Sequence, residues 1–110
     1  MPRLSALALI AAVAMTAAAR AADAPTGEEV AGRAIAETRC GACHATGPAG
    51  ESPMAKAPPF RSLGKNYPVE NLEEALAEGM VAGHPGMPDD PWDPADIAPF
   101  IAYLKSIQQP

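Results

Sequence analysis

Residues 40–44 read Cys40-Gly41-Ala42-Cys43-His44, a C-x-x-C-H sequence that contains both cysteines of this 110-residue chain. Two cysteines three positions apart on one helical turn can each add a thiol to one of the two vinyl groups of a haem. The imidazole that follows the second cysteine can then supply the proximal nitrogen to the iron. The motif therefore predicts one covalently bound haem c, attached through Cys40 and Cys43, with His44 as an axial ligand.

The motif has three other interpretations. A redox disulfide uses the same C-x-x-C spacing, but it normally lies in a strand–helix–strand pattern, which this sequence lacks. A zinc site needs four ligands, and the plausible fourth, His84, does not belong to a second paired motif. A chance occurrence is disfavoured by the exported character of the chain and by a methionine motif downstream.

The first 21 residues have the features of a secretory signal peptide. Arg3 precedes an apolar, alanine-rich run over residues 4–19, and small residues around Ala21 suit cleavage after that position. The run is short and weakly hydrophobic for a membrane span, and an uncleaved anchor is the alternative. Because bacteria attach haem to reduced cysteines after export, the leader and the haem motif together predict a periplasmic protein without stable membrane insertion.

Removing residues 1–21 leaves residues 22–110 as one small, acidic domain. Two of the eight basic residues, Arg3 and Arg20, fall in the leader. The remaining domain has six basic and thirteen acidic residues, which gives a formal charge of −7. This balance argues against a nucleic-acid partner. The clustering of Lys56, Arg61 and Lys65 ahead of most acidic residues predicts a dipole that can orient a redox partner.

Three segments have the pattern of helices. Thr26 and Glu29 form a capping box, which predicts a helix that runs to about Arg39 and delivers the haem motif. The expected apolar arc of this helix consists of Val30, Ala34, Ile35 and Thr38.

A second helix is expected to begin near Pro68 or Asn71, where Asn71 and Glu74 resemble a capping box, and to end at Gly79 or Met80. Its inner face consists of Leu72, Leu76 and Met80. Since these positions face inward together, Met80 is interpreted as core packing rather than as an iron ligand.

The third helix is expected to run from Pro94 or Ile97 to Ile107, with Asp93 or Asp96 as its N-cap. Pro99 favours the later start, because a proline inside the helix sacrifices a hydrogen bond. Its apolar face consists of Ile97, Phe100, Ile101 and Leu104. No repeat or strand pattern interrupts these helices, so the sequence predicts an all-α fold.

Two loops contain further candidate residues. Residues 45–59 are rich in glycine and proline, and the carbonyl ahead of Pro58 or Pro59 can hold the His44 imidazole in one orientation. In His84-Pro85-Gly86-Met87-Pro88, Met87 lies on constrained, non-helical backbone that can present a thioether to iron. Met87 is the expected sixth ligand, with His84 and then Met54 as its rivals.

Together these features resemble the class I cytochrome c family: an amino-terminal helix, C-x-x-C-H, a proline loop, a G-M-P loop and a carboxy-terminal helix over residues 26–109. The resemblance implies a small all-α fold of three to four helices around one haem. It also implies that Gly32 meets Tyr103 and that the carbonyl on the axial histidine belongs to Pro58, within Ala57-Pro58-Pro59-Phe60.

Two features depart from this pattern. Ala36 stands where many relatives have an aromatic residue, and the collar of lysines around the haem edge of mitochondrial members is missing. The resemblance implies a monohaem electron carrier, not an enzyme, that exchanges single electrons with a donor and an acceptor protein. Two alternatives are a haem enzyme or gas sensor with an open or labile sixth position, and a haem subunit docked to an oxidoreductase.

Overall fold

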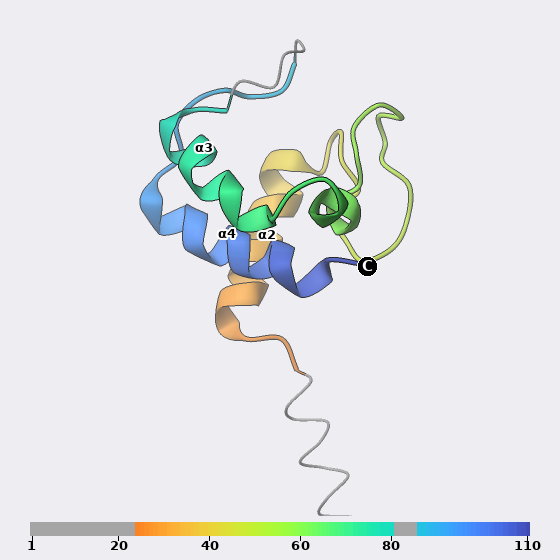
Figure 1. The fold of residues 1–110 in the computed structure, drawn as a ribbon, viewed down its shortest axis with the longest axis horizontal. Coiled ribbons are helices and arrows are strands. Elements are labelled where there is room, and N and C mark those ends of the chain that lie inside the picture. The colour runs from red at the N-terminus through yellow and green to blue at the C-terminus, as the bar shows by residue number, and fades with distance from the viewer. Residues whose placement is uncertain (1–23, 81–85) are drawn as a thin grey trace, which may run out of the picture.

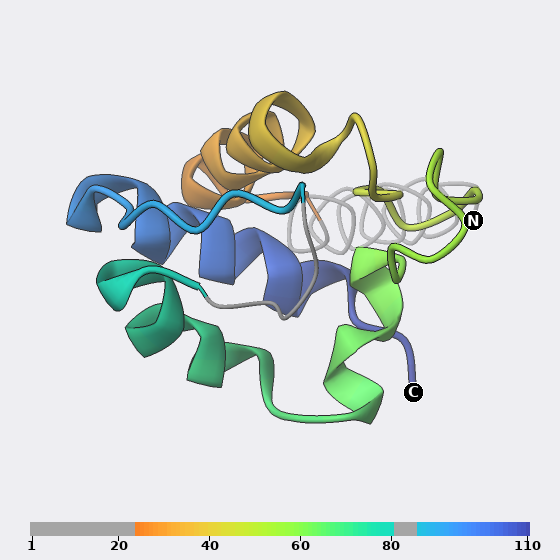
Figure 2. The same ribbon diagram turned by 90° about the horizontal axis from the view of Figure 1, so that it is seen from above.

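The computed structural model describes residues 24–80 and 86–110; the predicted leader, residues 1–21, and His84 lie outside these ranges. These ranges contain three α-helices, α2 (Gly27–Cys40), α3 (Leu72–Glu78) and α4 (Pro94–Ile107), and two short 3₁₀-helices between α2 and α3, η1 (Phe60–Lys65) and η2 (Val69–Asn71). Helix α4 runs between α2 and α3 and packs against both (Figures 1 and 2). The described residues contain no strand, and the predicted all-α fold class is confirmed.

Helices α2 and α4 cross at Gly32. A Cβ atom at this position would lie 2.7 Å from Cβ of Tyr103 and would overlap the carbonyl of Pro99. Only glycine therefore allows the two backbones to approach this closely. The contact between Gly32 and Tyr103 that the family resemblance implied is confirmed.

The buried face of α2 differs from the predicted apolar arc. Val30, Ala34 and Thr38 are exposed, whereas Gly32 and the fully buried Ala36 face α4. Of the predicted arc, only Ile35 packs against the core, where it is partly buried. The prediction was wrong for the other three residues because a close helix crossing selects the smallest side chains rather than the most apolar ones. Ala36 fills a position at which a larger side chain would hold the helices apart.

The start of α2 is as predicted. The hydroxyl of Thr26 accepts a hydrogen bond from the backbone N–H of Glu29 at 3.1 Å, and the Glu29 carboxylate accepts one from the N–H of Thr26 at 2.8 Å. These two bonds form the capping box and satisfy free backbone donors at the helix end. Helix α2 ends at Cys40, the first residue of the haem motif.

The other two helices begin at positions that the sequence offered, but one predicted cap and one preferred start were wrong. Asn71 makes no side-chain capping bond, because its backbone is already helical as the last residue of η2. Helix α4 begins at Pro94, and the Asp93 carboxylate accepts the N–H of Ala95 at 2.9 Å. The preference for the later start at Ile97, with Asp96 as N-cap, was wrong. A good cap and a proline at the first helical position outweigh the hydrogen bond that Pro99 omits inside the helix.

The core lies between α4 and the elements on either side of it. The predicted inner faces of the second and third helices are confirmed, since Leu76 and the four apolar residues of α4 are buried, and Leu72 and Met80 pack against them while partly exposed. The buried core cluster consists of Ala36, Phe60, Leu63, Val69, Leu76, Ile97, Phe100, Ile101, Tyr103 and Leu104. Within residues 24–80 and 86–110, no helix has the length and apolar character needed to cross a membrane.

Candidate haem-binding site

The C-x-x-C-H motif continues the last turn of α2. The backbone N–H groups of Cys43 and His44 donate to the carbonyl of Cys40 at 3.2 and 2.9 Å, and the N–H of Gly41 donates to Glu37. The two thiols and the imidazole therefore follow one another around a single turn at the helix end. The structure brings together the three residues that the motif singled out.

The imidazole of His44 is held by the proline segment. Its Nδ1 lies 2.8 Å from the carbonyl oxygen of Pro58, in line with the role that the family resemblance gave to Pro58. Because a carbonyl oxygen can only accept, Nδ1 must carry the proton in this hydrogen bond. In the neutral ring the lone pair is then on Nε2, which is the atom available to a metal.

Phe60 packs against the same imidazole. The two ring centroids are 4.9 Å apart with an interplanar angle of 37°, and Phe60 also meets Phe100 in an edge-on contact. The N–H of Phe60 donates to the carbonyl of Ala45 at 3.0 Å, which closes the loop between His44 and η1. Sequence reasoning placed Phe60 in the proline segment but did not predict its contact with His44.

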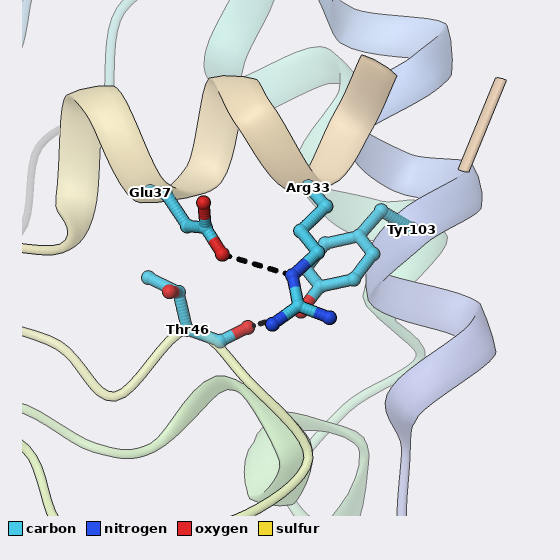
Figure 3. A network of polar contacts seen from close by, with 4 residues as sticks. All are labelled: Arg33, Glu37, Thr46 and Tyr103. Carbon is cyan, nitrogen blue, oxygen red and sulfur yellow. Dashed lines mark hydrogen bonds and ion pairs between the residues drawn. The ribbon is translucent and has the colours of Figure 1, made fainter. Parts of the chain in front are cut away.

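A buried hydrogen bond fixes the chain just beyond His44. Tyr103 of α4 donates its hydroxyl to the carbonyl of Thr46 at 2.6 Å, and burial raises the pKa of this phenol (Figure 3). Beside it, Arg33 and Glu37 of α2 form an exposed ion pair at 2.8 Å. Helix α4 is thereby connected to the segment that follows the histidine.

Cys40 and Cys43 are not joined by a disulfide, and each is partly buried. Burial raises the pKa of the Cys40 thiol to about 11. Redox-active C-x-x-C pairs instead have a lowered thiol pKa, so that a thiolate forms near neutral pH. The environment of Cys40 therefore does not favour the redox-disulfide interpretation.

Among the described residues, no group of three or more His, Cys, Asp or Glu side chains lies close enough together to hold a metal ion.

Met87 follows a sharp backbone turn at Gly86, whose φ is 95°, and is partly buried. Glycine adopts this positive φ without strain, and Pro88 restricts the chain on the other side. Of its rivals, His84 lies outside the described residues. Met54 has a side chain that is 51% exposed, and its backbone N–H donates to the carbonyl of Cys43.

The family model described as Cytochrome c matches residues 29–108. The chain belongs to the cytochrome c family. It is a haem-based electron-transfer protein with covalently bound haem c, in a family whose members are generally electron carriers rather than enzymes. Neither the comparison with curated proteins nor that with solved structures gives a match.

The site residues of this cytochrome fit haem c. Two thiols and one imidazole lie on one turn, and the hydrogen bond at Nδ1 leaves Nε2 free to coordinate. A c-type haem requires one imidazole nitrogen to coordinate the iron and two thiols to form thioethers with its vinyl groups. The thioether of Met87, on a constrained loop, is of the type that completes the coordination of iron in cytochromes c.

Proposed function

We propose that this protein is an exported, periplasmic monohaem electron carrier in which Cys40 and Cys43 hold the haem and His44 and Met87 are the axial ligands. The hydrogen bond between Nδ1 of His44 and the carbonyl of Pro58, next to the two cysteines, carries this proposal. It prepares the imidazole to coordinate through Nε2 and to keep one orientation in both oxidation states. When bound, the haem supplies an iron that takes one electron from a reduced partner and gives it to an oxidised one.

Different residues of the chain hold the proximal ligand and set the preference of the iron for one oxidation state. The Pro58 carbonyl and the Phe60 ring hold the imidazole, so that little reorganisation accompanies a change in iron charge. The Met87 thioether favours the ferrous state more than a second imidazole would. With both axial positions taken by side chains, the iron is closed to exogenous molecules, which suits electron transfer rather than substrate chemistry.

The proposal for compartment and partners depends on the leader and on charge. Residues 1–21 act as the signal peptide and residues 22–110 form the cytochrome c domain. Its excess of acidic residues favours a donor or acceptor protein that presents a basic surface, either free or as part of an oxidoreductase. Association with such a partner should be faster at low salt than at high salt.

Covalent attachment is the first test. The full chain, expressed in a bacterium with a haem-attachment system, should appear in the periplasmic fraction without residues 1–21, as measured by mass spectrometry. Haem should remain on the chain after acidic solvent extraction and on a denaturing gel. The variant Cys40→Ser/Cys43→Ser should lose its haem under the same extraction. If the wild type also releases its haem, the assignment of the two cysteines is wrong.

A further inference from the structure

Gln108, the residue that follows α4, connects the end of this helix to η1. Its Nε2 donates to the carbonyls of Phe60 at 2.8 Å and Leu104 at 2.9 Å, and its Oε1 accepts from the N–H of Gly64 at 2.7 Å. One side-chain amide can make these three bonds because it carries two donor hydrogens and an acceptor oxygen. The amide therefore connects the beginning and the later part of η1 to the last turn of α4.

The close approach of Gln108 depends on Gly64. A Cβ atom at Gly64 would lie 2.9 Å from Oε1 of Gln108, which is too close for both to keep their places. The next residue reinforces the connection, since the N–H of Gln109 donates to the carbonyl of Arg61 at 2.9 Å. Figure 2 shows the carboxy-terminal end of the chain passing beside η1, coloured green.

Phe60 relates this connection to the candidate axial ligand. Its ring packs on the His44 imidazole, and the carbonyl that binds Nδ1 of His44 belongs to Pro58, two residues before it. Pro59 lies between the two and has a restricted φ, so a displacement of Phe60 is transmitted to the Pro58 carbonyl. The amide of Gln108 is thus separated from the His44 hydrogen bond by one short, stiff segment.

We propose that Gln108 is a positioning residue for the proximal ligand: by fixing Phe60 it holds the Pro58 carbonyl against His44 and thereby lowers the reduction potential of the haem. This inference depends on the proposed function, in which His44 coordinates the iron. A hydrogen bond accepted from Nδ1–H makes the imidazole more basic, and a more basic ligand stabilises ferric iron. Loosening the Pro58 carbonyl should therefore raise the potential.

The test compares the haem-loaded wild type with Gln108→Leu, which keeps the approximate volume of the side chain but removes its three hydrogen bonds. We expect a midpoint potential more positive than that of the wild type. We also expect the His44 Nδ1 proton to exchange with solvent about fivefold faster, as followed by nuclear magnetic resonance. This factor corresponds to weakening the hold on the imidazole by the net worth of one hydrogen bond.

The matched control is Gln109→Ala. The side chain of Gln109 binds the carbonyl of Pro48 at 3.0 Å and not η1, and its backbone bond to Arg61 survives the substitution. This variant should keep the wild-type potential and exchange rate. Unchanged values in Gln108→Leu, or equal changes in both variants, would overturn the positioning role.

A second variant covers a failure of Gln108→Leu to load haem. Gly64→Ala places a methyl group against Oε1 of Gln108 and should move the amide, giving a smaller positive shift in potential. An unshifted potential in Gly64→Ala would also overturn the role. The wild-type spectrum separates this inference from the proposed function: if the His44 resonances are not shifted by the iron, His44 is not a ligand, and the proposed function fails first.

Discussion

The segment from His44 to Phe60 and the loop from Gly79 to Trp92 hold the two candidate axial ligands in different ways. The first is held by hydrogen bonds beside its ligand: Nδ1 of His44 donates to the carbonyl of Pro58, and the N–H of Phe60 donates to the carbonyl of Ala45. The second is fastened at its base, where the N–H of Trp92 donates to the carbonyl of Leu76 at 2.9 Å.

This difference teaches where each ligand's position is determined. At His44, neighbouring hydrogen bonds and an aromatic contact fix the ring directly. At Met87, the described constraints are the positive φ of Gly86, the proline that follows, and the closure of the loop at Gly79 and Trp92. We therefore expect a perturbation of the fold to release Met87 from the iron before it disturbs His44.

Among the substitutions considered, the largest loss of stability is expected in the segment from His44 to Phe60. Phe60→Ala removes a ring that is 6% exposed and packs on both His44 and Phe100. The free energy of unfolding, measured in guanidinium, should fall by about 3–5 kcal/mol, the range for buried phenylalanine replaced by alanine. Tyr67→Ala, at the partly exposed rim of the core, is the control and should cost less. Equal losses in the two variants would contradict a central role for Phe60.

Straining the base of the Met87 loop should have an intermediate effect. Gly79 has a φ of 103°, and a Cβ there would lie 2.6 Å from the carbonyl oxygen of Asp89. Gly79→Ala should therefore destabilise the loop by about 2 kcal/mol, combining the strain of positive φ with this overlap. The sulfur-to-iron charge-transfer band should then disappear at a lower denaturant concentration than the helical circular dichroism.

Gly86→Ala is the control for that experiment. Gly86 has a similar φ of 95°, but none of the described residues comes within 4 Å of the position that a Cβ would take. The substitution should show only the backbone strain, about 1 kcal/mol. If the charge-transfer band and the helical circular dichroism of Gly79→Ala are lost at the same denaturant concentration, Met87 is not released before His44, and the proposed difference between the two ligands is wrong.

Removing the Tyr103 hydroxyl should have the smallest effect. Tyr103→Phe deletes the bond to the Thr46 carbonyl and should lower the free energy of unfolding at neutral pH by about 1 kcal/mol. Burial raises the folded-state pKa of this phenol above its unfolded value near 10. The contribution is therefore complete below about pH 10 and is lost as pH rises through the folded pKa. Unfolding followed by circular dichroism should show the difference from wild type narrowing at alkaline pH; a constant difference would refute this account of Tyr103.

The sequence predicted the features that depend on short-range chemistry. The C-x-x-C-H turn, the Thr26 capping box and the inner faces of α3 and α4 each follow from residues within a few positions of one another. The residues alone narrowed the carbonyl that binds His44 to the one ahead of Pro58 or Pro59, and the family resemblance then chose Pro58. The contact between Gly32 and Tyr103 also came from the resemblance, since the two residues are distant in the chain.

The sequence failed mainly where tertiary packing decides between local alternatives. The buried face of α2 was mispredicted because the crossing with α4 selects small residues. The start of α4 was misjudged for a local reason, since the Asp93 cap and Pro94 outweigh the hydrogen bond that Pro99 omits. No local sequence pattern predicted the 3₁₀-helix η1 or the hydrogen bonds of Gln108. These bonds join Gln108 to Gly64 and Phe60, which lie 44 and 48 residues earlier in the chain.

The axial ligands are the central claim, and the charge-transfer band from methionine sulfur to ferric iron tests it most directly. We predict that Met87→Ala loses this band, has a lower reduction potential and binds carbon monoxide rapidly in the ferrous state. His84→Ala, three positions away, should keep the band and resist carbon monoxide. Survival of the band in Met87→Ala, or two axial imidazoles in the magnetic resonance spectrum of the wild type, would contradict the assignment of Met87.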